Sequence, residues 1–241
     1  MRRSQLMFSP ISFELSMKTI RAITFLFMAL FSALANASSA SGIWTSTGGS
    51  FLVLMEQSSS GAVVAFSVSP TLQTGAVLLG SRSADALTLK SLDAQATWTI
   101  ALSGSSYTGT YTAAGSTQAT SGHLLLAYGG SANDAIWQKS DGSARFLSTI
   151  TLLSDGAQLM VLFDVRIGAT VSEVTYDVSA GAVQSLGASS SFIGKSLLSG
   201  NTVNLSFKGG SPATGAYSVV TSTRPFTTVE QFDVSAVFGV D

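Results

Sequence analysis

Apolar and polar residues alternate with a period of two along most of the chain. The alternation is clearest at 64–68, 98–102, 174–178 and 203–207, where every second residue is large and apolar. A period of two places successive side chains on opposite faces of a β-strand. Valine, isoleucine, threonine and aromatic residues, which fill these segments, suit such a half-buried surface. The pattern therefore predicts strands, and after about residue 42 no stretch has the spacing of three and four that indicates a helix.

Short clusters of serine, glycine, asparagine and aspartate separate the predicted strands. The clusters read SSSG at 58–61, SGSS at 103–106, SDG at 154–156, SGN at 199–201 and KGG at 208–210. These compositions are typical of hairpin turns. Short strands joined by such turns predict an all-β fold, an antiparallel sandwich or barrel.

Two phrases recur in the same order along the chain. GIWTSTGGSF at 42–51 resembles AIWQKSDGSARF at 135–146, and TWTIALSGSSYTGTY at 97–111 resembles TVNLSFKGGSPATGAY at 202–217. The shared order predicts two internally duplicated units, 42–128 and 135–241. Chance similarity in a sequence rich in serine, glycine and threonine is the alternative. Because a unit of this size buries a limited share of its surface, we expect the two units to pack together.

The N-terminus has the pattern of a signal peptide. An apolar run, AITFLFMALFSALA at 22–35, follows several basic residues and is followed by Ala35-Asn36-Ala37, which favours cleavage after Ala37. The run is shorter than the roughly 20 residues of a membrane-spanning helix. We therefore expect 1–37 to be a cleaved leader, with no transmembrane segment after its removal. Met17 opens a leader of ordinary length, so 1–16 would precede the true start.

Composition narrows the setting and the partners. The chain has no cysteine, only 10% charged residues and a net charge of −1. A fold without disulfides is ordinary for a bacterial exported protein, so we expect a secreted or periplasmic location. The absence of a basic face argues against nucleic acid.

Residues with catalytic potential are few and scattered. His123 is the only histidine, no G-x-S-x-G elbow accompanies it, and neither zinc ligands nor a complete calcium loop is present. Several carboxylates lie in or beside predicted strands, and we expect Glu56 and Asp164 to occupy matching places in the two units. A glycosidase would need two of them in one cleft. The carboxylates concerned are Glu56, Asp164, Glu173, Asp177 and Glu230. We assign no catalytic residue, no metal site and no cofactor.

The aromatic residues are the candidate ligand-binding set. They are Trp44, Trp98, Tyr111, Trp137 and Tyr217. Such residues can form a stacking platform for sugars or line the pocket of a barrel. Trp44 and Trp137 each open one unit and precede a turn, which also fits a role as core residues.

The phrases G-x-W at 42–44 and T-G-x-Y at 108–111 and 214–217 resemble the calycin style of small barrel, the lipocalin and avidin group. They also resemble secreted bacterial β-repeat proteins rich in glycine and tryptophan. The calycin resemblance implies a barrel that binds a small ligand, although calycins have a single barrel.

The sequence favours an exported, non-enzymatic protein that works by binding or assembly at a matrix or cell surface. Its partners would be carbohydrate, another cell-surface component, or further copies of itself, since strand edges without lysine or proline invite pairing. Three alternatives remain open: a secreted hydrolase acting on a polymer, a small-molecule-binding barrel with a pocket near Trp98, and an outer-membrane barrel.

Overall fold

The protein, described by a computed structural model, is all-β and antiparallel, which confirms the predicted fold class. The structure describes residues 39–68, 75–155, 157–168, 174–186, 189–223 and 226–241. The predicted leader at 1–37 lies outside them. The four alternating segments that predicted strands lie on β3, β6, β12 and β14, with bounds given below.

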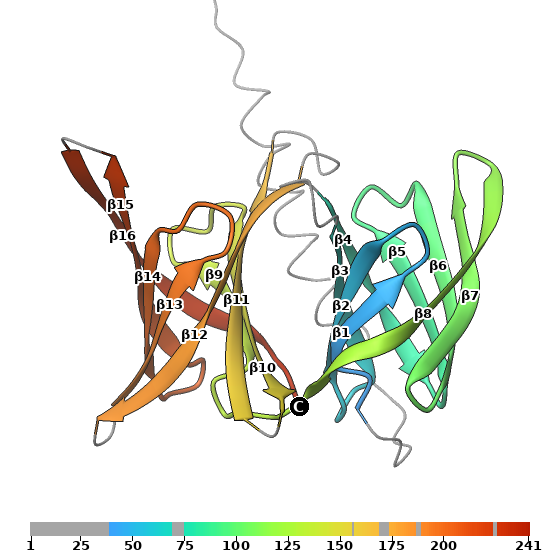
Figure 1. Cartoon of the computed structure of the whole chain (residues 1–241), viewed down its shortest axis with the longest axis horizontal. Coiled ribbons are helices and arrows are strands. Elements are labelled where there is room, and N and C mark those ends of the chain that lie inside the picture. The colour runs from blue at the N-terminus through green and yellow to red at the C-terminus, as the bar shows by residue number, and fades with distance from the viewer. Residues whose placement is uncertain (1–38, 69–74, 156, 169–173, 187–188, 224–225) are drawn as a thin grey trace, which may run out of the picture.

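The first eight strands form a closed ring, which we call barrel 1 (Figure 1). Each strand pairs with the next along the chain, and β1 closes the ring by pairing with β8 from Gly42↔Ala127 to Trp44↔Leu124. The strands are β1 (Gly42–Ser46), β2 (Ser50–Gln57), β3 (Ala62–Val68), β4 (Gly75–Ser83), β5 (Ala86–Ser91), β6 (Ala96–Ser103), β7 (Ser106–Ala113) and β8 (Ser116–Tyr128).

The remaining strands form a second closed ring, barrel 2. Here β16 returns to pair with β9 from Val234↔Lys139 to Gly239↔Ala135, and β9 also pairs with β10. The strands are β9 (Ala135–Lys139), β10 (Arg145–Ser154), β11 (Ala157–Ile167), β12 (Val174–Leu186), β13 (Ser189–Ser196), β14 (Thr202–Lys208), β15 (Thr214–Thr223) and β16 (Phe226–Gly239). The sequence predicted either a sandwich or a barrel. The pairing of β1 with β8 and of β9 with β16 shows that both units are closed barrels.

Side-chain hydroxyls extend the closure of barrel 1 beyond the short β1–β8 ladder. Thr45 Oγ1 accepts a hydrogen bond from His123 N at 2.9 Å and donates to His123 O at 3.2 Å. Thr47 Oγ1 bonds Ser121 N and O in the same way, at 2.8 and 3.1 Å. These hydroxyls satisfy main-chain groups of β8 that have no strand partner at this point.

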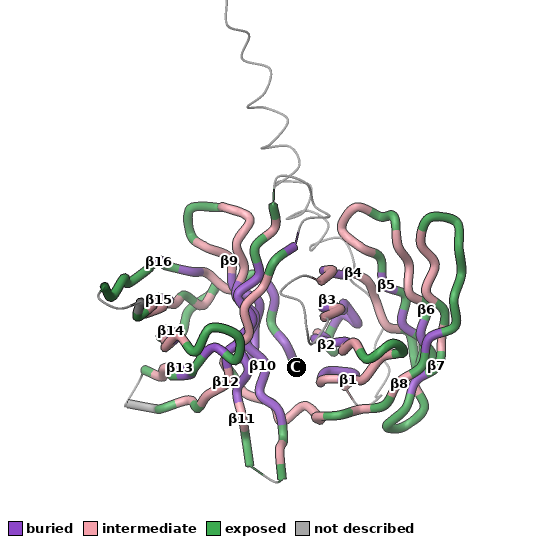
Figure 2. The backbone as a smooth tube through the Cα atoms, turned by 45° about the horizontal axis from the view of Figure 1, so that its top comes forward, coloured by how far each residue is buried: buried purple, intermediate pink, exposed green. Residues whose placement is uncertain are grey.

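The two barrels stand side by side and share an apolar layer, which we call the central layer (Figures 1 and 2). It is made by outward-facing residues of β2, β3 and β4 from barrel 1 and of β9, β10, β11, β12 and β16 from barrel 2. Among these residues are Val53, Val64 and Phe66 on one side and Ile150, Phe163 and Val165 on the other. Because β2, β3, β10 and β11 are buried on both faces, they carry nearly continuous apolar runs instead of alternation.

Each barrel also has its own filled interior. Trp44, Leu54, Leu89 and Ile100 belong to the cluster inside barrel 1. A second cluster, with Trp137 among its members, fills barrel 2. Small antiparallel barrels of eight strands are just wide enough for side chains to fill them.

We call the ends of the barrels upper and lower, following Figure 1. Strands β1 and β9 both run toward the upper ends. The C-terminus lies at the lower end, where Asp241 N donates to Glu56 O and Tyr128 Oη donates to Val240 O, each at 3.0 Å. The last two residues therefore join barrel 2 to barrel 1.

Candidate functional site

Three of the five candidate aromatic residues are part of the barrel interiors. Trp44, Trp137 and Tyr217 are 3%, 2% and 2% exposed. Trp44 Nε1 donates to Ala40 O at 3.1 Å, and Trp137 Nε1 donates to Thr149 Oγ1 at 3.0 Å. These side chains are buried, hydrogen-bonded and packed against neighbouring rings in the barrel cores.

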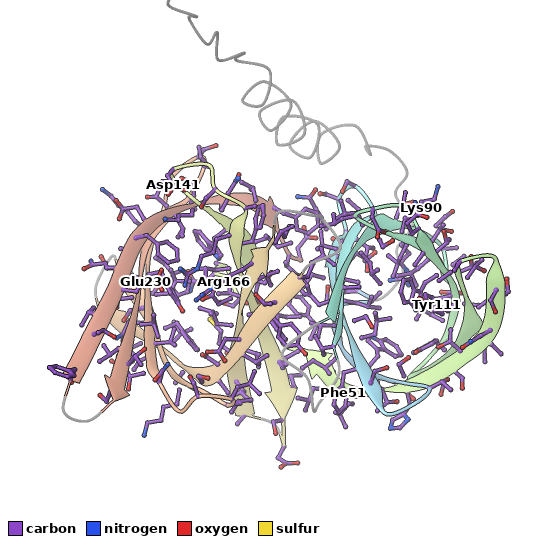
Figure 3. The ribbon with its side chains drawn as sticks, turned by 90° about the horizontal axis from the view of Figure 1, so that it is seen from above. Phe51, Lys90, Tyr111, Asp141, Arg166 and Glu230 are labelled. Carbon is purple, nitrogen blue, oxygen red and sulfur yellow. The ribbon has the colours of Figure 1, made fainter. Side chains whose placement is uncertain are left out.

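The other two, Trp98 and Tyr111, lie together and half-buried at the upper end of barrel 1. They are directly opposite each other on β6 and β7, and their ring centroids are 4.2 Å apart at an interplanar angle of 40°. The fully buried Leu89 on β5 lies opposite Trp98 on its other side. Figure 3, which looks onto the upper ends, shows Tyr111 inside the ring of barrel 1. This placement follows from alternation, because Trp98 shares a strand face with the interior residues Ile100 and Leu102.

Hydroxyl-bearing side chains accompany this pair at the upper end. The same alternation assigns four serines to the interior face of their strands, two residues from an interior apolar residue, and Thr120 of β8 is added by its contact with the interior Tyr107 of β7. The five residues are Ser46, Ser50, Ser67, Ser91 and Thr120. Thr120 Oγ1 lies 3.5 Å from both Ser46 Oγ and Tyr107 Oη. We call Trp98, Tyr111 and these five residues the aromatic site, and it contains no charged side chain.

The upper end of barrel 2 has a different character, because an ionic network occupies its interior. Arg145 binds Asp164 through two contacts, Nε to Oδ1 at 2.9 Å and Nη2 to Oδ2 at 2.7 Å, and it also contacts Glu230. Arg166 Nη2 lies 3.2 Å from Asp164 Oδ2, and Tyr217 Oη donates to the same oxygen at 3.3 Å. Figure 3 shows Arg166 and Glu230 inside the ring of barrel 2.

The electrostatics of this network fit a structural role. Burial opposes the charge of Arg145, but hydrogen bonds from its guanidinium to Asp164 and Glu230 raise its pKa above the ordinary value. Burial and then the charge of Asp164 raise the pKa of Tyr217. The guanidinium also lies 4.3 Å from the ring centroid of Phe232, which adds a cation–π contact. The charges neutralise one another, and both groups are held in their ordinary protonation states.

Of the carboxylates considered for hydrolysis, Glu56 lies apart, whereas Asp164 and Glu230 meet in the ionic network of barrel 2. Asp177 on β12 is directly opposite Asp164 on β11, and Asp164 and Glu230 are both ion-paired with Arg145. Glu56 lies at the lower end of barrel 1, where its Oε2 contacts Arg82 Nη1 at 3.0 Å and accepts from Ala40 N at 2.6 Å. Asp164 lies at the upper end of barrel 2. The expectation that the two occupy matching places is wrong, because Glu56 is on the second strand of its barrel and Asp164 is on the third strand of the other. Glu173 lies outside the described residues.

His123 is an exposed residue of β8 whose Nδ1 lies 3.0 Å from Thr45 Oγ1. Within the described ranges it has no ion pair or hydrogen bond with a carboxylate that could orient it as a base. Its main chain is the part of the residue that closes barrel 1.

Asp134 is a buried acid that the sequence did not single out. It is 3% exposed and is the last residue of the β8–β9 connection, immediately before β9. Thr151 Oγ1 donates to its Oδ1 at 2.8 Å, whereas Oδ2 has no hydrogen-bond partner among the described residues. Burial raises the pKa of Asp134 to about 6, and its charge, after burial, raises the pKa of the neighbouring Tyr128.

The central layer contains a small apolar cavity of about 30 Å³, lined by residues such as Phe66, Val77, Ile136 and Phe146. It has room for little more than one water and offers no polar partner, so it does not suit a ligand.

Among the described residues, no group of three or more histidine or acidic side chains could hold a metal ion. No helix in the described ranges is long and apolar enough to cross a membrane.

Comparison with known proteins adds no assignment. No protein-family model matches the chain, and no curated protein or solved structure matches it at a significant level.

Proposed function

We propose that the protein is an exported, non-enzymatic binding protein whose aromatic site binds an uncharged carbohydrate. The observation that carries the proposal is the half-buried pair of Trp98 and Tyr111, 4.2 Å apart, at an end of barrel 1 lined by hydroxyls. A sugar ring presents C–H groups that pack on aromatic faces, and its hydroxyls exchange hydrogen bonds with serine and threonine.

The surroundings of the aromatic site support a neutral ligand over a charged one. Lys90, the nearest strand cation in sequence, follows the interior residue Leu89 and therefore lies on the outer face of β5. An anionic ligand would find no cation among the residues of the site and would lose solvation on entering it. The one neighbouring acid, Asp93, accepts a hydrogen bond from Ser91 Oγ in the β5–β6 turn. An uncharged polyol needs only the neutral donors and acceptors that are present.

The export half of the proposal depends on the leader pattern at 1–37 and on the absence of cysteine. Antiparallel barrels of eight strands carry small ligands in several binding-protein families, which supports binding over catalysis. The small-molecule alternative uses the same site and differs only in the ligand.

A glycan array probed with the purified protein tests the proposal. We expect binding to one class of neutral oligosaccharide and an at least tenfold loss of affinity for Trp98→Ala and for Tyr111→Ala, which equals about 1.4 kcal/mol. Leu197→Ala is the control, since it removes a large apolar side chain that is 67% exposed on barrel 2. No glycan binding by the wild type, or equal losses in the control, would reject the proposal. Mass spectrometry of the native protein with a retained non-sugar ligand would favour the small-molecule alternative.

A further inference from the structure

Strand β16 extends beyond the strand that closes barrel 2. Residues Phe226 to Ser235 of β16 pair with β15 on one side. On the other side of β16, β9 pairs only from Val234 onward. No described strand pairs with residues 226–232 on that side. β15 and β16 therefore project as an arm at the upper end of barrel 2, as Figure 1 shows.

The hydrogen-bonding direction along β16 can be assigned from two contacts. Ala236 N donates to Ala213 O on the β15 side, and Asp233 O accepts from Ser140 N on the β9 side. Backbone groups in an antiparallel strand alternate between its two neighbours. The N–H and C=O groups of Thr227, Val229 and Gln231 thus point to the open side of the arm.

Exposed apolar side chains lie along the same edge. Phe226 is 71% exposed and Val229 is 61% exposed. Residues 226–232 contain neither lysine nor proline, two residues with which proteins protect a strand edge, and their one charged residue, Glu230, contacts Arg145 of its own barrel. The edge combines unpaired backbone groups with apolar surface.

We propose that a second copy of this chain pairs with this edge, β16 against β16, antiparallel about a two-fold axis through Val229. This register uses the open backbone groups of all three residues, with Val229 opposite Val229 and Thr227 opposite Gln231 of the partner. The proposal concerns barrel 2 and does not depend on sugar binding at barrel 1.

Charge and packing both favour a second copy as the occupant. In this register Glu230 faces Thr228 of the partner, whereas an axis through Glu230 would place two carboxylates opposite each other. Phe226 faces Phe232 of the partner, and the two Val229 side chains meet on the other face of the new sheet. The strand is thus complementary to itself in hydrogen bonds and apolar contacts, and no two like charges are directly opposed.

Sedimentation of the purified full chain over a concentration series tests the pairing. We expect a monomer–dimer equilibrium in the wild type. Val229→Pro removes an N–H that β15 does not use, and Val229→Lys places two like charges at the axis, so both should shift the protein to monomer. Ile193→Lys, a matched change at an exposed residue of β13 (41% exposed), should leave the dimer intact. A monomeric wild type, or a dimer that persists in both Val229 variants, overturns the proposal.

A cross-link keeps the test decisive if those variants fold poorly. The chain has no cysteine, so Val229→Cys introduces a single thiol at the axis. Opposed residues of a hydrogen-bonded antiparallel pair have Cα atoms about 5.5 Å apart, within the range of a disulfide. Mild oxidation should give a covalent dimer for Val229→Cys and much less for Ile193→Cys. Equal cross-linking of the two would contradict the register.

Discussion

Arg145 and Asp164 face each other inside barrel 2 as a two-point ion pair, with contacts of 2.9 and 2.7 Å between side chains that are 11% and 4% exposed. Removing one member of a buried pair leaves an uncompensated charge, which typically costs 3–5 kcal/mol, whereas replacing both by apolar residues costs far less. The ion pair should therefore matter most when only half of it is lost.

We expect Arg145→Met to lower the free energy of unfolding by about 3 kcal/mol. The double variant Arg145→Met with Asp164→Leu should lose less than the two single variants added together. Urea denaturation of the four proteins measures this coupling. Strictly additive losses would show that the two side chains do not act as a pair.

Asp134 should make stability depend on pH in the acidic range. Its folded pKa of about 6 lies above the ordinary 3.8, so the folded protein holds the proton more tightly than the unfolded chain does. The free energy of unfolding should therefore fall as pH rises from about 4 to about 6 and level off above that range. Asp134→Asn should remove this slope and raise stability at neutral pH by at most about 3 kcal/mol.

Urea denaturation across this range, taken as the difference between wild type and variant, isolates Asp134 from other titrating groups. Asp141→Asn is a suitable control. A hydrogen bond from Lys139 lowers the pKa of Asp141 to about 2, so this exposed acid stays ionised throughout the range. Parallel curves for wild type and Asp134→Asn would contradict a buried acid that exchanges its proton on unfolding.

The central layer should couple the two barrels energetically. Phe66 of barrel 1 and Phe163 of barrel 2 stack across it, with ring centroids 5.7 Å apart and an interplanar angle of 21°. Phe163→Ala should cost about 3–5 kcal/mol. A double-mutant cycle with Phe66→Ala should show coupling, and a cycle of Phe66→Ala with Phe192→Ala, inside barrel 2, should show none. Additive effects in the first cycle would mean that the stack contributes nothing.

Barrel 1 should not be stable alone. A fragment of residues 38–130 would expose the outward apolar faces of β2, β3 and β4, which the central layer buries in the whole protein. We expect this fragment to lack a cooperative thermal transition by calorimetry. A sharp melt close to that of the whole protein would contradict a stabilising role for the layer.

The sequence was most informative where one strand face is buried and the other faces solvent. Alternation identified β6, β12 and β14 because the interior and exterior of the barrels impose a period of two. On β3 large and small residues alternate at 64–68, although both faces of that strand are buried. The alternation is lost on β2 and β11, because both faces of these strands are covered by apolar residues. The outer face of each strand is covered by the other barrel, and a single strand's sequence does not show this contact.

The candidate site was only partly visible in the sequence, since residue type does not reveal depth. Five aromatic residues were named, and Trp98 and Tyr111 differ from the other three by lying at an end of the barrel and not in its middle. The network around Arg145 went unrecognised because Arg145, Asp164 and Glu230 come from three strands. One local signal existed, since Asp164 and Arg166 fall on one strand face, next to an apolar run.

The most direct test of the central proposal is a fluorescence titration with the oligosaccharide that binds best on the array. Trp98 is the half-exposed tryptophan, and Trp44 and Trp137 are buried. We predict that the sugar shifts the emission and protects it from acrylamide quenching in the wild type, with no response in Trp98→Phe. Undiminished sugar affinity in Trp98→Ala, measured in parallel by calorimetry, would contradict binding at the aromatic site.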